Sequence, residues 1–228
     1  MTSARKTTAI ILKRIDFGEA DRIVTALTPQ GKISLLVKAA RRQRSKLASG
    51  IELLSENEIG YIEGRGELMT LISSRVIKQW TNLLSDYDRL QMAYELLKNI
   101  QRMTDRHTGE EFYETLRTAL SALDEPGNSL TLVETWFLLQ CLAIGGHKPN
   151  LATDQHGSKL DADKRYELDY EHGTLLPVDT GGLDAEHIKL WRVSISNPLD
   201  IVLGIRGASE VSIKSSATLK RFVQYQYK

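Results

Sequence analysis

The chain of 228 residues has a single cysteine and no long hydrophobic run, and each shortage excludes a class of protein. One thiol, Cys141, cannot form an internal disulfide and cannot build a thiolate zinc site alone. Its apolar neighbours favour a buried structural thiol, because a catalytic thiol needs a partly exposed, electropositive setting. No apolar run reaches the roughly 18 residues that span a bilayer, and the apolar stretch at Ile10 is too short for a signal peptide. We therefore expect a globular cytoplasmic protein.

The sequence also lacks the motifs of common catalytic sites. It contains no phosphate-binding G-x-x-x-x-G-K-[ST], no G-x-G-x-x-G that opens a helix, no G-x-S-x-G and no H-E-x-x-H. Asp154, His156 and His172 share one segment but match no zinc spacing, and Asp161 with Asp163 is a weak candidate for magnesium in a solvated, charge-rich stretch. We therefore expect no enzymatic activity, no metal and no other cofactor.

The charges are unevenly distributed along the chain. The net charge is +1 overall, but residues 1–50 contain 11 Lys and Arg against 3 Asp and Glu. The segment 38–47, KAARRQRSKL, has several cations and no acid. Such a basic segment is typical of a surface that meets a phosphate backbone, although a solvated face looks the same in sequence.

Alternating apolar residues and turn signals predict strands in the first third of the chain. The turn Thr28–Gly31 has Pro at its second position and Gly at its fourth, which favours a hairpin. Five short strands before residue 80 favour a small barrel of the OB type, with an SH3-like barrel as the alternative. The predicted strands cover Ile10 and Leu12, 23–27, 32–37, 51–62 and 67–77. The position of the basic segment between strands predicts a loop, with a short basic helix as the alternative.

The apolar period changes to about 3.6 residues beyond residue 83, which predicts helices. The segment 130–144 is apolar nearly all round, so we expect it to be a central, buried helix. Residues 147–183 form a polar, turn-rich insert with a small hairpin around His172 and Gly173. Helical periodicity returns after residue 183, and no internal repeat is present.

The N-terminal third resembles the opening of bacterial RecO proteins, which combine four motifs. A basic pair follows an apolar strand, a D-[YF]-G-E-x-D-R-I-V segment comes next, and a T-P-x-x-G-K hairpin leads into K-G-A-R-[RK]-x-x-S. The chain reads DFGEADRIV, TPQGK and KAARRQRS at these places, with Ala39 where the family has glycine. The resemblance is specific over about 80 residues, and KPNL and the closing helix agree with the family's layout.

This resemblance implies an α+β protein and its organisation. The N-terminal five-stranded OB-fold barrel binds DNA and spans residues 1–80. A helical domain follows at 81–146, then a zinc-finger-like insert at 147–183 that lacks cysteines, and a C-terminal helical segment at 184–228 that packs on the helical domain. Many members carry paired C-x-x-C motifs in this insert, so the chain resembles the zinc-free branch of the family.

The resemblance also implies a function in DNA repair at the nucleoid. A RecO protein binds single- and double-stranded DNA, anneals complementary strands, engages the C-terminal tail of SSB, and acts with RecR to load RecA, its indirect partner. None of these steps needs bond chemistry. A protein-interaction adaptor whose basic face binds acidic tails is the alternative, and a nuclease is a weaker one.

The basic motif residues are the candidates for DNA contact, and Lys38, Arg41 and Arg42 are the strongest because the motif and the charge run both include them. Arg22 has the alternative of a structural ion pair with Glu19 or Asp21. Phe17 is expected to pack in the core or a turn rather than to stack on bases. The full set of DNA candidates is Lys13, Arg14, Arg22, Lys32, Lys38, Arg41, Arg42, Arg44 and Lys46.

A second set of cations is a candidate for binding the SSB tail. Lys98, Arg102 and Arg106 follow one another at helical spacing, where they would form the rim of an apolar groove for an acidic peptide. Solvated surface charge is the alternative interpretation of the same spacing.

The first prediction concerns zinc. A closed structural zinc site takes four Cys or His ligands, and the insert has only scattered histidines. We expect the purified protein to contain no zinc and a chelator to leave its melting temperature unchanged. Elemental analysis that finds one equivalent of zinc would contradict this.

Overall fold

The computed structural model describes residues 4–43, 45–64, 66–105 and 108–228. The chain divides into two compact units, Met1–Asp124 and Glu125–Lys228. The division falls inside the range 81–146 that the sequence analysis treats as one helical domain.

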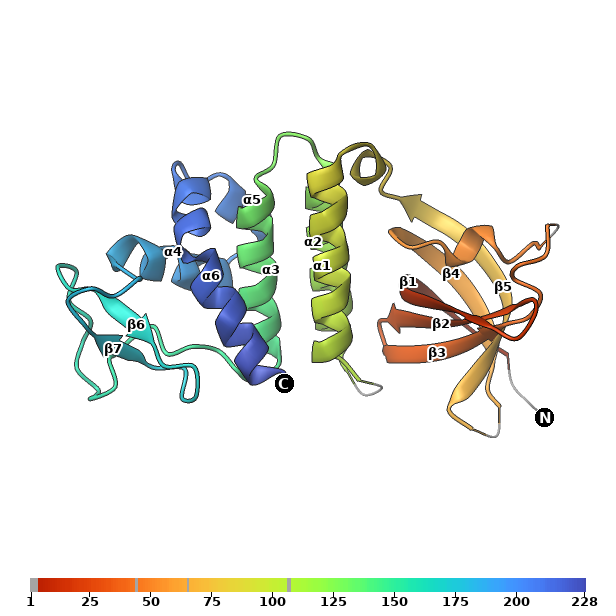
Figure 1. Ribbon diagram of the computed structural model, residues 1–228, viewed down its shortest axis with the longest axis horizontal. Coiled ribbons are helices and arrows are strands. Elements are labelled where there is room, and N and C mark those ends of the chain that lie inside the picture. Colours follow the sequence, from red (N-terminus) through yellow and green to blue (C-terminus); the bar gives the residue numbers. More distant parts are fainter. Residues whose placement is uncertain (1–3, 44, 65, 106–107) are drawn as a thin grey trace. The chain divides into compact units, whose positions relative to one another are not determined.

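The first unit contains a closed five-stranded barrel (Figure 1). Its strands are β1 (Ala4–Phe17), β2 (Asp21–Thr28), β3 (Gly31–Val37), β4 (Ser55–Ile62) and β5 (Leu68–Gln79). They follow the order β1-β2-β3-β5-β4, and β1 pairs with β4 to close the barrel. Only β3 and β5 run parallel among the pairs formed by these strands. This is the OB topology, so the predicted fold class is confirmed.

A β-bulge in β1 decides which side chains face the barrel core. Ala9 and Ile11 lie in that core, and the register with β2 then shifts between Ile11 and Lys13. Because one extra residue reverses the alternation, Arg14 and Asp16 come to the core side and the odd-numbered residues turn outward. The last residues of β1 therefore present Lys13, Ile15 and Phe17 on the outer face.

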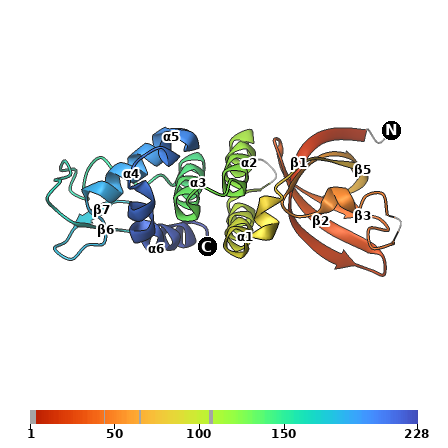
Figure 2. The same cartoon turned by 90° about the horizontal axis from the view of Figure 1, so that it is seen from above.

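Two helices cover part of the barrel's outer surface (Figure 2). They are α1 (Tyr87–Met103) and α2 (Glu110–Asp124), which follow the short 3-10 helix η2 (Asn82–Ser85), while η1 (Ser49–Ile51) lies in the loop before β4. Ile10 and Leu27 are fully buried although they are not part of the barrel core, and Gln101 of α1 donates to the carbonyl of Leu12. Trp80 is buried where the barrel ends, and its Nε1 donates to Ser121 of α2.

The second unit is built around the buried helix α3 (Leu130–Ile144), as the apolar sequence predicts. The helices α4 (Ala185–Ser196), α5 (Leu199–Leu203) and α6 (Ala208–Gln226) pack against it. Glu134 of α3 is 2% exposed, and Lys220 of α6 approaches its carboxylate at 3.0 Å. Cys141 is fully buried on α3, and burial raises the pKa of its thiol. The thiol is thus a structural residue, as expected.

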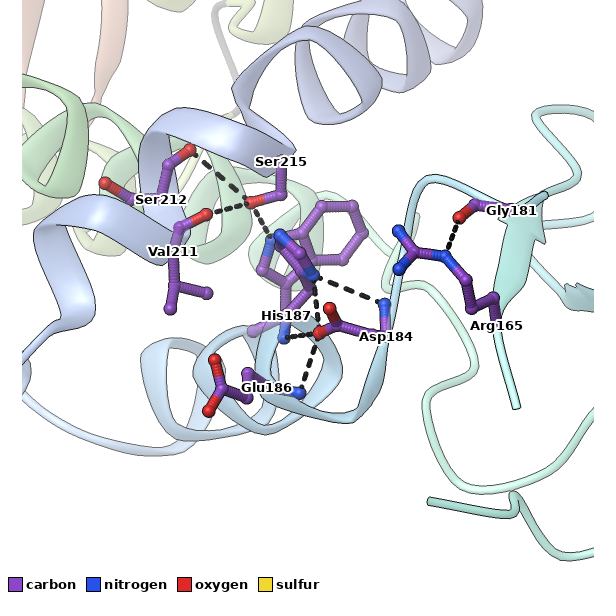
Figure 3. A network of polar contacts seen from close by, with 9 residues as sticks. Arg165, Gly181, Asp184, Glu186, His187, Val211, Ser212 and Ser215 are labelled. Atoms are coloured by element: carbon purple, nitrogen blue, oxygen red, sulfur yellow. Dashed lines mark hydrogen bonds and ion pairs between the residues drawn. The ribbon is translucent and has the colours of Figure 1, made fainter. Parts of the chain in front are cut away.

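A polar network closes the start of α4 (Figure 3). The Asp184 carboxylate accepts hydrogen bonds from the backbone amides of Glu186 and His187 at 3.0 and 3.3 Å, and the His187 ring lies 2.7 Å from the same oxygen. One turn further on, Trp191 donates to Ser215 of α6. The cap therefore fixes the start of α4 at the point where the chain leaves the insert, and the Trp191–Ser215 hydrogen bond joins the helix to α6.

Two aspartate turns hold the insert, together with the hairpin of β6 (Tyr166–Leu168) and β7 (Leu175–Pro177). The Asp154 carboxylate accepts from the amides of His156 and Ser158, both at 2.9 Å. The Asp169 carboxylate accepts from the amide of Glu171 at 2.9 Å and contacts His172 at 2.7 Å. The predicted hairpin around His172 is present, and carboxylates accept hydrogen bonds from turn amides in the insert.

None of the helices in the described ranges combines the length and the apolar character needed to cross a membrane.

The Asp169–His172 pair predicts a pH dependence. The hydrogen bond to Asp169 raises the pKa of His172 above 6.5, and the hydrogen bond from His172 lowers the pKa of Asp169 below 3.8. The histidine's contribution to stability is complete below pH 6.5 and is lost as the pH rises through its folded pKa. The aspartate's contribution is complete above pH 3.8 and is lost as the pH falls through its folded pKa. The pair therefore stabilises the insert most between these two values.

We expect the His172 resonances in an NMR titration to report a pKa above 6.5, and Asp169→Asn to lower it. His156, an exposed histidine of the same insert, serves as the internal control. An unchanged His172 titration in the variant would contradict the pairing.

Candidate nucleic-acid interface

Two turns at one end of the barrel are joined by hydrogen bonds. They are the β1–β2 turn, residues 18–20, and the start of the loop after β3, residues 38–42. The amide of Ala39 donates to the Asp21 carboxylate at 2.7 Å, and the amide of Arg41 donates to the carbonyl of Ala20 at 2.9 Å. We call these two turns the basic platform, because they carry Lys38, Arg41 and Arg42 of the predicted DNA contacts.

Asp16 binds two arginines of the basic platform and its flanking strand. Arg22 Nε donates to its carboxylate at 3.0 Å, and Arg41 Nε lies 3.5 Å away. The hydrogen bond from Arg22, together with the charges of Arg41 and Arg14, holds the pKa of Asp16 below its ordinary value. Arg22 therefore forms a structural ion pair, but its partner is Asp16, directly opposite on β1, and not Glu19 or Asp21.

Ala39 adopts a left-handed backbone conformation with φ 54°. This conformation costs little for glycine and more for any residue with a Cβ, which agrees with the glycine that the RecO-like motif predicts at this place. The chain keeps the turn despite the substitution, because the Ala39 amide is held by Asp21. Alanine in place of glycine at position 39 therefore adds backbone strain to the basic platform and leaves its charge unchanged.

Two further DNA candidates have partners within the first unit. Arg14 Nη1 lies 2.6 Å from the Glu52 carboxylate. Lys32 Nζ donates to the carbonyl of Gln101 in the last turn of α1 at 2.7 Å, and partial burial lowers the pKa of this lysine. Its amide donates to the carbonyl of Asp105 at 2.9 Å, so Lys32 ties the barrel to α1. A phosphate would have to compete with these contacts.

Four of the predicted cations are exposed and have no ion-pair or side-chain hydrogen-bond partner within the described residues. They differ from the paired cations in that a phosphate could be bound without breaking an existing contact. Arg44 lies outside the described residues. The four are Lys13, Lys38, Arg42 and Lys46.

Phe17 was expected in the core or in a turn; it is 50% exposed on the outer face of β1, so the core placement is wrong, and it lies directly before the β1–β2 turn. Simple alternation from Ile11 would direct residue 17 inward, but the bulge at Leu12 reverses it. Tyr61, the other aromatic residue before position 80, is 7% exposed and belongs to the barrel core. One sequence signal indicates that Phe17 lies on the outer face. Charged and apolar residues alternate there, with Arg14 and Asp16 on one side of the strand and Ile15 and Phe17 on the other.

One face of α1 carries the second predicted set of cations. Tyr87, Tyr94, Lys98 and Arg102 recur at helical spacing and are exposed, the tyrosines at 75% and 44%. Lys98 Nζ lies 3.7 Å from Glu95. Arg106, the third predicted member, lies outside the described residues. The face thus combines aromatic side chains with cations, a feature that the charge pattern alone did not predict.

The described residues contain no group of three or more His, Cys, Asp or Glu side chains that could hold a metal ion. In the insert, Asp154 and Asp169 are engaged with backbone amides and His172 with Asp169. The insert therefore does not fit the structural zinc that many RecO proteins bind.

A family profile matches the barrel, and individual known proteins match most of the chain. The sequence profile of the family described as "Recombination protein O N terminal" matches residues 1–80. A protein named DNA repair protein RecO from Dehalococcoides mccartyi (strain CBDB1) is 30% identical over 219 residues, which cover 94% of this chain and 82% of that protein. Another of the same name from Roseiflexus sp. (strain RS-1) is 28% identical over 228 residues, covering 96% and 80%.

We predict that Ala39→Gly stabilises the protein. Glycine relieves the left-handed strain, about 1–2 kcal/mol for an L-residue, and the greater freedom of the unfolded chain offsets about 0.4–1 kcal/mol of this. The free energy of unfolding should rise by about 0.5–1 kcal/mol in urea denaturation. Ala48→Gly is the matched control, because Ala48 has a helical φ of −61° and should lose stability. A variant at position 39 that is less stable than wild type would contradict the strain.

Proposed function

Because the chain belongs to the RecO family of DNA repair proteins, we propose that it is a recombination mediator that acts on single- and double-stranded DNA. In this proposal it anneals complementary strands and, together with RecR, helps to load RecA onto DNA coated with SSB. The roles of these three proteins rest on family membership. The DNA-binding role also has support from the barrel.

The observation that carries DNA binding is the separation of paired from unpaired cations. Arg22 and Arg41 share an ion pair with Asp16, and Arg14 pairs with Glu52. Lys38 and Arg42 have no such partner, and they stand on a turn fixed by backbone hydrogen bonds. Cations of this kind can bind phosphates without breaking an existing ion pair, and the loop that carries them loses little conformational entropy because it is already ordered.

Annealing needs charge neutralisation rather than catalysis. Two complementary strands repel each other through their phosphates, and cations that displace condensed counterions lower this repulsion. No covalent bond is made or broken, so we propose a non-enzymatic role. Direct readout of base edges is not needed, and we expect weak sequence preference.

The salt dependence of DNA binding tests this proposal. We expect Lys38→Ala and Arg42→Ala each to weaken duplex binding for any sequence and to reduce the log-log salt slope by roughly 0.9 per lost phosphate contact. Both side chains are exposed, so the melting temperature should not change.

Lys159→Ala and Lys164→Ala are matched controls, because both lysines are exposed but lie in the acidic insert. A double variant of Lys38 and Arg42 with wild-type affinity and salt slope would show that the basic platform is only solvated. Failure of the wild-type protein to bind bare oligonucleotides would favour the adaptor that binds acidic protein tails.

We further propose that the α1 face of Tyr87, Tyr94, Lys98 and Arg102 receives the acidic, apolar tail of SSB. Aromatic rings offer apolar contact, and the cations offer partners for the acidic residues. Lys98→Ala with Arg102→Ala should weaken binding of a tail peptide, measured by fluorescence anisotropy, and leave DNA affinity unchanged. Unaltered peptide affinity in this double variant would move the site elsewhere.

A further inference from the structure

Phe17 is the exposed aromatic residue of the barrel strands. Half of its surface is accessible, whereas Tyr61 is buried in the core. An exposed phenyl ring gives up apolar burial that would otherwise stabilise the fold. Its position is nevertheless fixed, because Phe17 is the last residue of β1 and pairs in register with Asp21.

The outer face that carries Phe17 also carries a row of apolar residues, in addition to Asp21, the direct cross-strand partner of Phe17. Ile15, two residues earlier on the same face, is 48% exposed. Ile23 pairs with Ile15, and Leu36 pairs with Ile23 on the next strand, so a short apolar row crosses β1, β2 and β3. Gly18 follows Phe17 with φ 58°, and apart from its two chain neighbours no residue has an atom within 4 Å of the position where its Cβ would be. The turn beside Phe17 is therefore open, and the ring itself is half exposed.

Phe17 also belongs to the basic platform through its neighbours in sequence. Asp16, the preceding residue, binds Arg41, and Ala20 and Asp21 hold the backbone that carries Lys38 and Arg42. Lys13 lies on the same face of β1, because the register from residue 13 to residue 17 is continuous. A flat apolar ring is thus fixed to the turns that carry unpaired cations.

We infer that Phe17 is a base-stacking residue that gives this interface its preference for unpaired DNA. The inference rests on the proposed DNA-binding function. The face of an unpaired base can stack on the phenyl ring while Lys38 and Arg42 take the adjoining phosphates. A base inside a duplex is already stacked on both sides and does not present its face. Phe17 therefore contributes to single-strand binding, and the cations contribute to both forms of DNA.

Binding of three variants to a short thymidine strand and to a duplex of equal length tests the inference. Phe17→Ala should lower single-strand affinity about 5- to 100-fold, the usual range for a lost stacking contact. Duplex affinity should change less than about twofold, and the salt slope should stay that of wild type because no phosphate contact is lost. Phe17→Leu keeps apolar area without an aromatic face and should be impaired as well, whereas Phe17→Trp should bind normally.

The tryptophan variant gives a direct signal. The chain's own Trp80, Trp136 and Trp191 are at most 6% exposed, so a tryptophan at position 17 adds an exposed fluorophore. Single-stranded DNA should quench this added emission, and the duplex should not. Ile72→Ala on β5 is the matched control for loss of an exposed apolar side chain, since Ile72 is 45% exposed.

Three outcomes would overturn the inference. The first is wild-type single-strand affinity of Phe17→Ala or Phe17→Leu, and the second is equal loss of single-strand and duplex binding. The third is intact DNA binding with loss of a protein partner, which would assign the apolar row to protein docking. Failure of the proposed function is distinguishable, because wild-type protein would then bind neither DNA and the Lys38 and Arg42 variants would have no effect.

Discussion

The hydrogen bonds that join the β1–β2 turn to the loop after β3 determine what this barrel can present to a ligand. Asp21 fixes Ala39, Ala20 fixes Arg41, and Asp16 takes up the charge of Arg22 and Arg41. Without these contacts, a loop rich in like charges would be pushed apart by its own repulsion. Two carboxylates and one carbonyl thus order the loop while leaving other cations of the same loop free to act.

The bulge at Leu12 has consequences beyond the strand that contains it. The half of β1 before the bulge contributes Ala9 and Ile11 to the barrel core. The half after the bulge contributes Arg14 and Asp16 to a charged end of the barrel. The bulge also places Asp16 on the core side of the strand and turns Phe17 to the outside. The faces on which the ion-pair cluster and the exposed ring lie are therefore set by one inserted residue in one strand.

Sequence patterns were sufficient for the fold because burial follows them closely here. Alternating residues gave the five strands, the apolar segment 130–144 gave the central helix, and the N-terminal motifs identified the family. They were insufficient for the candidate site. A count of cations cannot separate Lys38 from Lys32, because Lys32 finds its carbonyl partner 69 positions away in α1. Phe17 was misjudged because a bulge leaves no mark in the alternation that precedes it.

The insert lets the family's loop architecture persist with different chemistry. Thiolates bound to zinc are oxidised by peroxide, and the metal is then released together with the structure that it holds. Asp154 and Asp169 hold their turns through carboxylate oxygens, which such oxidants do not attack, and the chain's one thiol, Cys141, is fully buried. These turns of the insert are therefore held by groups that this oxidation does not attack.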